Sequence, residues 1–216
     1  MSAPQLVIFD CDGVLVDSES ISARVSSQIL NEHGWSIAPA DVVARFKGCT
    51  DEHWRAAVAE RIPAASLDEW HERQAARYDA AFNNELVAID GVAEAIARIP
   101  VPICVASNGS HVKIERNLER VGLLDLFRGA IFSAQDVPRG KPAPDLFLHA
   151  AITMDVSPAT VVVVEDSRHG VAAAAAAGMR CLMYSSESPG RDVVSPGTLV
   201  FESMDRLPAL LGFATD

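Results

Sequence analysis

The chain has 216 residues, of which 49% are hydrophobic and 22% charged, a composition typical of a folded globular protein and not of a disordered one. Its 29 acidic residues outnumber 18 basic ones, and the formal net charge of −11 argues against a general nucleic-acid binder, because affinity for a phosphate backbone is mainly electrostatic. No apolar run approaches the roughly 18 residues of a membrane helix, and the N-terminus lacks the pattern of a signal peptide.

Short apolar runs recur along the chain, separated by stretches with helical periodicity. Such runs are typical of strands buried on both faces, and the strands we expect are 6–9, 101–106, 130–132, 161–164, 180–184 and 198–201. The helices we expect between them are 110–121, 145–154 and 170–177. Strands that alternate with helices predict an α/β protein with a Rossmann-like, doubly wound parallel sheet.

The stretch 18–85 interrupts this alternation. It has helical patterns broken by glycines and prolines, it shows no convincing strand, and it contains all three tryptophans. We expect it to form an all-helical insertion of about four helices between the first and second strands. The predicted organisation is therefore a core domain made of 1–17 and 86–216, with an inserted helical domain at 18–85.

Asp10 and Asp12 follow the first expected strand, and Gly13 allows a sharp turn directly after them. Ligands of parallel sheets bind beyond the carboxyl ends of the strands, and side chains two residues apart point to the same side of an extended chain. Both carboxylates can therefore face one site, one as nucleophile or metal ligand and the other as general acid or base. Taken alone, this motif could equally form a structural turn.

Two further motifs lie in loops that precede helices. Ser107, Asn108 and Gly109 come at the end of the second strand, where a hydroxyl and backbone N–H groups can form an anion site or simply cap the helix. Pro142 disfavours helical geometry at Lys141. The lysine is therefore presented from a loop, either to the site or as a solvated charge.

Glu165 and Asp166 follow the most apolar expected strand, where they can hold Mg²⁺, which prefers oxygen ligands, or cap the next helix. Because the carboxyl ends of parallel strands meet at one edge of a sheet, we expect the four motifs to form one site. Carboxylates, a lysine and a helix N-terminus suit Mg²⁺-assisted phosphoryl transfer, in which positioning and charge stabilisation provide most of the catalysis.

Together the motifs resemble those of the haloacid dehalogenase (HAD) superfamily, and they span nearly the whole chain. The pattern DxDGxLxDS stands at 10–18, SN at 107–108, KP at 141–142, and EDS at 165–167 with a following Gly170. The helical insertion is similar to the family's C1 cap. The segment RFKG at 45–48 is similar to that of the β-phosphoglucomutase-like sugar-phosphate phosphatases within the family.

The resemblance implies a role for each motif. Asp10 would be the nucleophile that becomes an aspartyl phosphate, and Asp12 would be the general acid and base. Ser107 and Lys141 would hold the transferring phosphoryl group, and Lys141 would also offset the charge of Asp10. The implied substrate-contacting residues are Arg45, Lys47, Gly48, Asn108 and Gly109.

The resemblance also implies Mg²⁺ as the cofactor. Its site would include Asp10, the backbone carbonyl of Asp12, and Asp166, with Glu165 in the same cluster.

The activity that the resemblance implies is that of a phosphatase, a phosphoric monoester hydrolase. Asp12 favours phosphate monoesters, since haloacid dehalogenases and phosphonate-cleaving relatives lack this second aspartate. Ser22 stands where β-phosphoglucomutases carry a histidine, which counts against a phosphosugar mutase. The expected substrate is a small phosphorylated metabolite, such as a sugar phosphate or a phosphorylated sugar acid like 6-phosphogluconate. A mutase and a non-catalytic binding protein of the same fold are the alternatives.

The four cysteines are scattered and include no CxxC pair. Reduced thiols, and with them a cytoplasmic location, are therefore expected. The lack of a long apolar run predicts that the protein has no membrane partner.

Overall fold

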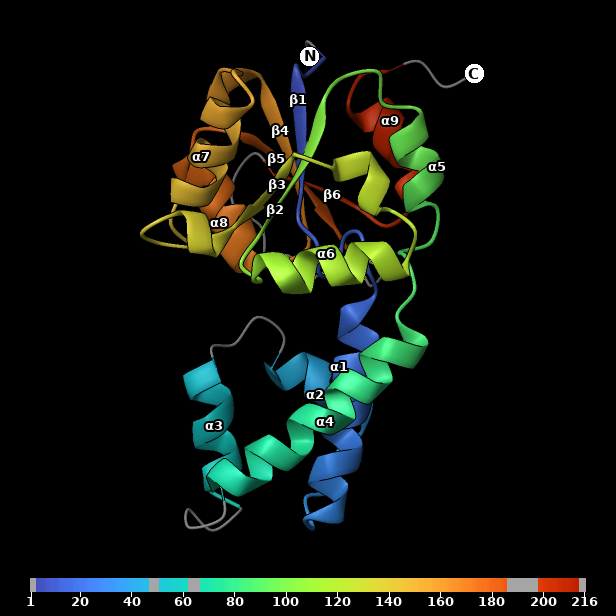
Figure 1. Ribbon diagram of the computed structural model, residues 1–216, viewed down its shortest axis with the longest axis vertical. Coiled ribbons are helices and arrows are strands. Elements are labelled where there is room, and N and C mark those ends of the chain that lie inside the picture. The colour runs from blue at the N-terminus through green and yellow to red at the C-terminus, as the bar shows by residue number, and fades with distance from the viewer. Residues whose placement is uncertain (1–2, 47–50, 62–66, 186–197, 214–216) are drawn as a thin grey trace. The chain divides into compact units, whose positions relative to one another are not determined.

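The computed structural model describes residues 3–46, 51–61, 67–185 and 198–213 (Figure 1). The chain divides into two compact units. One consists of Met1–Val16 with Val87–Asp216, and the other of Asp17–Leu86. No helix in the described ranges is long and apolar enough to cross a membrane.

The first unit is built around a six-stranded sheet in which every pair of neighbours is parallel. The strand order is β3-β2-β1-β4-β5-β6, so the N-terminal strand lies in the middle. The strands are β1 Leu6–Phe9, β2 Ile103–Ser107, β3 Ile131–Ser133, β4 Val161–Glu165, β5 Arg180–Tyr184 and β6 Leu199–Phe201. All six strands expected from the apolar runs are therefore present, and the prediction of a doubly wound α/β fold is confirmed.

The central strands are apolar because both of their faces are covered. Every residue of β1 and β4 is buried, which explains their unbroken apolar runs. Alternate residues such as Leu6, Ile8 and Val163 share one hydrophobic core with Leu146 and Val171. Figure 1 shows α7 (Asp145–Thr153) and α8 (Arg168–Ala176) on one side of the sheet, and α5 (Val92–Ala97) and α9 (Leu207–Leu210) on the other.

Short polar motifs start the helices that follow the site strands. Ser110 caps α6 (His111–Arg120) by accepting a hydrogen bond from the Lys113 N–H at 3.3 Å. Ser167 caps α8 in the same way through Gly170. Because of this cap, α8 begins at Arg168, two residues before its expected start, and Gly170 lies inside its first turn.

Helices are the only regular elements among the described residues of the second unit. They are α1 Ser18–Glu32, α2 Pro39–Phe46, α3 Asp51–Ala59 and α4 Leu67–Glu85. Helix α1 packs against both α2 and α4, and Trp35 lies buried against the ring of Phe46. The chain enters and leaves this unit at neighbouring points of the first, since Val16 bridges to Ala88 and the Ile89 N–H donates to the Leu15 carbonyl.

Candidate active site

The candidate site lies beyond the carboxyl ends of three adjacent strands. Asp10 follows β1, Ser107 ends β2 and Glu165 ends β4. The strand order β2-β1-β4 places these ends side by side, and the loop before α7 adds Lys141. The edge of the sheet thus brings together residues separated by up to 156 positions in the sequence, counted from Asp10 to Asp166.

Lys141 lies between two buried carboxylates. Its Nζ atom is 2.7 Å from Asp10 Oδ1 and 2.6 Å from Glu165 Oε1. The side chain of Lys141 is only 4% exposed, that of Asp10 11% and that of Glu165 0%. The ammonium group also lies 4.8 Å from the centre of the Phe147 ring, a favourable cation–π contact. The lysine is therefore a buried member of the site and not a solvated surface charge.

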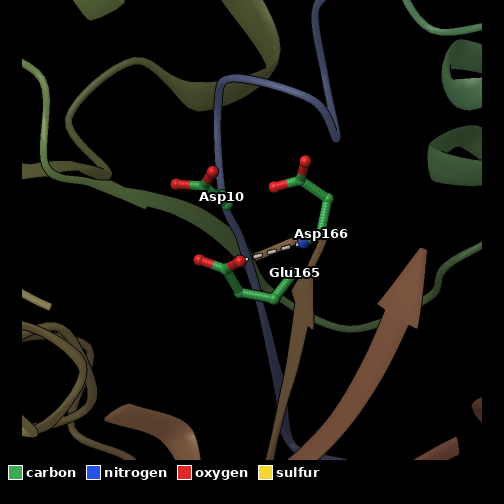
Figure 2. Close-up of side chains that lie close together, drawn as sticks. All are labelled: Asp10, Glu165 and Asp166. Atoms are coloured by element: carbon green, nitrogen blue, oxygen red, sulfur yellow. Dashed lines mark hydrogen bonds between the residues drawn. The ribbon is translucent and has the colours of Figure 1, made fainter. Parts of the chain in front are cut away.

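Glu165 is held in place by several donors besides Lys141. Its Oε2 atom accepts hydrogen bonds from the N–H of Asp166 at 2.9 Å, the N–H of Ser167 at 2.8 Å and the Ser167 hydroxyl at 2.9 Å. Figure 2 shows the first of these bonds. A Cβ atom at Gly170 would lie 1.8 Å from the Glu165 carboxyl carbon, so only glycine leaves room for this carboxylate. Both Glu165 oxygens are thus engaged by the protein, and its carboxylate orients Lys141.

The charges of this cluster shift the pKa values of its members. Burial alone would lower the pKa of Lys141, but Asp10 and Glu165 outweigh that effect and raise it, so the lysine stays charged. Burial raises the pKa of Asp10 well above its ordinary value, and Lys141 acts in the opposite direction. The charges of Glu165 and Asp166 add to the increase. One lysine does not neutralise three carboxylates, so a further cation would favour the ionised form of Asp10.

The acidic residues are arranged as a site that a divalent cation fits. Asp10, Glu165 and Asp166 are buried, and each offers a carboxylate oxygen within 4.8 Å of the others. Figure 2 shows the three carboxyl groups close together. A Cβ atom at Gly13 would lie 2.3 Å from Asp166 Oδ2, so the glycine turn keeps this space for Asp166. Hard oxygen donors of this kind suit Mg²⁺ and similar ions.

Asp12 is paired with a residue that the sequence motifs did not include. Its Oδ2 atom is 2.6 Å from Nζ of Lys113, which projects from the first turn of α6. The side chain of Asp12 is 27% exposed and that of Lys113 43%. Asp12 Oδ1 is buried and accepts no hydrogen bond within the described chain. Lys113 comes three residues after Ser110, the N-cap of α6. This position in the first turn of the helix is the sequence signal that could have indicated a lysine near the site.

The loop after β2 is tied to its surroundings by its own polar groups. The Gly109 N–H donates to Ser107 Oγ at 3.2 Å, and the Gly109 carbonyl accepts from the Ser133 hydroxyl at 2.6 Å. The amide of Asn108 bonds to the backbone of Lys141. The substrate contacts predicted for Asn108 and Gly109 stay a prediction. In the structure the Asn108 side-chain amide and the Gly109 N–H and carbonyl form bonds within the protein.

The remaining predicted substrate residues belong to the helical unit. Arg45 is exposed near the end of α2, and its guanidinium carbon lies 5.1 Å from the centre of the Trp35 ring. Lys47 and Gly48 lie outside the described residues.

Comparison with known proteins adds to this geometry. A family model described as a haloacid dehalogenase-like hydrolase matches residues 4–178. The chain belongs to the haloacid dehalogenase-like hydrolase family. The 6-phosphogluconate phosphatase of Escherichia coli K12 is 33% identical to this chain. The aligned region covers 97% of this chain and 96% of the Escherichia coli protein.

Solved structures of haloacid dehalogenase-like proteins share the fold. A conserved protein of this kind from Agrobacterium tumefaciens superimposes with a TM-score of 0.84 and 39% identity, over 96% of this chain and 97% of its own. A Thermotoga maritima protein proposed to be a β-phosphoglucomutase gives a TM-score of 0.81 at 25% identity, over 96% and 98% of the two chains. The predicted family is confirmed, and with it the enzyme class of phosphoric monoester hydrolase.

Proposed function

We propose that this protein is a Mg²⁺-dependent phosphatase that hydrolyses a small phosphorylated metabolite through an aspartyl-phosphate intermediate. The observation that carries the proposal is the position of Asp10. Its carboxylate lies at the end of the central strand, bonded to the buried ammonium group of Lys141 and within a cluster of three carboxylates. A nucleophile, a fixed positive charge and a cation site are the parts that phosphoryl transfer requires.

In the first step, a carboxylate oxygen of Asp10 attacks phosphorus and the ester P–O bond breaks. Asp12 gives its proton to the leaving oxygen, which departs as an alcohol. Lys141 offsets the negative charge around Asp10 and the transferring group, and Ser107 holds a phosphoryl oxygen by hydrogen bonding. The distance of 2.7 Å between Lys141 Nζ and Asp10 Oδ1 supports the role assigned to the lysine.

In the second step, Asp12 takes a proton from water, and the resulting hydroxide attacks the phosphorus of the aspartyl phosphate. The P–O bond to Asp10 breaks, inorganic phosphate leaves and both aspartates return to their starting forms. Lys113 holds Asp12 Oδ2 at 2.6 Å and so keeps this carboxylate beside the nucleophile's loop. Asp12 is partly exposed, which allows it to exchange protons with solvent.

Mg²⁺ would be held by Asp10, Asp166 and the backbone carbonyl of Asp12, with Glu165 as the residue that orients its neighbours. When bound, it supplies positive charge to the phosphoryl oxygens during transfer. The buried oxygen-only donor set supports this choice of cation.

We further propose that the helical unit acts as a cap that provides substrate specificity, with Arg45, Lys47 and Gly48 among the contacting residues. A phosphorylated sugar acid such as 6-phosphogluconate is the leading candidate substrate. Two basic side chains in the segment 45–48 suit a substrate with a second negative group, and the similar Escherichia coli protein is named for that compound. A cytoplasmic location is part of the proposal, supported by the buried free thiols of Cys11, Cys104 and Cys181.

The test is a screen for phosphate release from phosphorylated metabolites, including 6-phosphogluconate, with and without Mg²⁺. We expect selective release that depends on Mg²⁺. The matched control is Asp10→Asn, in which kcat should fall to below about one thousandth of the wild-type value. A fully active Asp10→Asn enzyme would refute the assigned nucleophile. Conversion of sugar phosphates to isomers without phosphate release would indicate the mutase alternative instead.

A further inference from the structure

The side chain of Asn108 binds both backbone hydrogen-bonding groups of Lys141. Asn108 Nδ2 donates to the Lys141 carbonyl oxygen at 3.0 Å, and the Lys141 N–H donates to Asn108 Oδ1 at 2.9 Å. The two residues lie 33 positions apart, one in the loop after β2 and the other in the loop before α7. A single amide therefore joins the two loops at the lysine itself.

Gly140 provides the space that this pairing requires. A Cβ atom at position 140 would lie 2.6 Å from Asn108 Oδ1 and 3.0 Å from the Cβ atom of Ala134. A contact of 2.6 Å is shorter than side chains tolerate, so any other residue at 140 would displace the Asn108 amide or the loop. The glycine and the asparagine are thus matched parts of one contact.

The backbone of Lys141 determines where its ammonium group lies. Nζ reaches Asp10 Oδ1 and Glu165 Oε1 from the end of a flexible four-carbon stem. The next residue is Pro142, which has no N–H with which to hold the loop. The two hydrogen bonds with the Asn108 amide therefore hold the backbone N–H and carbonyl of Lys141 directly.

We propose that Asn108 is a positioning residue: its amide fixes the backbone of Lys141, and thereby places the ammonium group between Asp10 and Glu165, while Gly140 leaves the room for this contact. The inference rests on the proposed function for its catalytic consequence. It replaces the direct substrate contact expected for Asn108 from the sequence. A displacement of about 1 Å in a group of this kind can lower a rate about 100-fold.

The first experiment compares kcat and KM of Asn108→Ala, Asn108→Asp, Gly140→Ala and the Asn108→Ala/Gly140→Ala double variant. We expect kcat of Asn108→Ala to fall about 10- to 100-fold with little change in KM. Gly140→Ala should reproduce this loss from the other side of the contact, and the double variant should be no worse than the poorer single variant. Asn108→Asp keeps an acceptor for the Lys141 N–H but places a negative oxygen against the Lys141 carbonyl, so its kcat should fall at least as far as that of Asn108→Ala. Pro138→Ala, an exposed change in the same loop, is the control that should keep wild-type kinetics.

The opposite pattern would overturn the proposal. If Asn108 binds substrate directly, Asn108→Ala will raise KM with little change in kcat, and Gly140→Ala, which displaces the same amide, will raise KM as well. Losses of kcat that multiply in the double variant would likewise show that the two residues act separately.

A second experiment needs no substrate and separates this inference from the proposed function. Lys141→Met is introduced into wild type and into Asn108→Ala, and the shift of the urea unfolding midpoint is measured in each. If Asn108 places Lys141 in its ion pairs, the shift will be smaller in the Asn108→Ala background, whether or not the wild type releases phosphate. Equal shifts in both backgrounds would refute the positioning role, and a silent phosphate screen would refute the proposed function alone.

Discussion

Gly170→Ala is a substitution for which helix propensity and the structure predict opposite results. Gly170 lies in the first turn of α8, and its φ angle lies outside the left-handed region that favours glycine. In an ordinary helix interior, alanine is more stable than glycine by about 1 kcal/mol. Here the new Cβ atom would lie 1.8 Å from the carboxyl carbon and from Oε1 of Glu165. One of the two groups must therefore move.

The cost follows from how firmly Glu165 is held. Its side chain is 0% exposed, and its carboxylate accepts bonds from Lys141, the Asp166 N–H, the Ser167 N–H and the Ser167 hydroxyl. Hydrogen bonds to charged groups contribute about 1.5–3 kcal/mol each, so the loss of two costs about 3–6 kcal/mol. After the helix-propensity gain of about 1 kcal/mol, a net loss of about 2–5 kcal/mol remains. For a chain of this size, that lowers Tm by about 4–20 °C.

Urea unfolding followed by circular dichroism would measure the change in the free energy of unfolding. Ala172→Gly, at an exposed position in the same helix, is the matched control and should lose about 1 kcal/mol by propensity alone. A Gly170→Ala protein as stable as wild type or more so, alongside the expected loss in Ala172→Gly, would refute the reasoning about Glu165.

The other predictions concern the charged groups of the site. Lys141→Met should lower the free energy of unfolding by about 3–5 kcal/mol at pH 8, because it leaves buried carboxylates without their partner. The folded-state pKa of Lys141 is raised from 10.5, so the stability that its charge contributes is complete below pH 10.5 and is lost as the pH rises further. The free energies of unfolding of Lys141→Met and wild type should therefore converge above pH 10.5. A difference between the two that widens with pH would contradict this. Lys113→Met should lower kcat about 10- to 100-fold by freeing Asp12, and Lys113→Arg should recover part of the loss; equal kcat values in all three proteins would exclude a role for the pair. Removal of divalent cations with EDTA should abolish phosphate release and added Mg²⁺ should restore it, whereas full activity in EDTA would refute the metal assignment.

The strands and the site edge could be predicted from the sequence because local patterns determine them. Both faces of β1 and β4 are covered, so their residues form unbroken apolar runs that are visible without a structure. The polar motifs at the strand ends then follow from parallel topology, which gathers them at one edge. The structure indeed brings Asp10, Lys141 and Glu165 into direct contact.

Other features could not be predicted because they depend on contacts distant in the sequence. The six-residue helix α5 is too short to show a periodic pattern, and it packs against the C-terminal segment. The pairing of Lys113 with Asp12 spans 101 positions, and that of Asn108 with Lys141 spans 33. Sequence patterns placed Asp12, Asn108 and Lys141 near the site but not Lys113, and they did not show which partner each residue has.

The central place of β1 has a consequence for the order in which the protein folds during synthesis. This strand is made before the other five strands of the sheet, yet it pairs with β2 at Ile103–Val105 and with β4 at Val161–Val164. At about 5–20 residues per second, roughly 8–30 s separate the synthesis of β1 from that of β4. During that interval the fully apolar segment Leu6–Phe9 lacks its later neighbour, and an unpaired apolar strand is prone to aggregate. The central strand of the sheet therefore cannot be covered on both edges until most of the chain has been made.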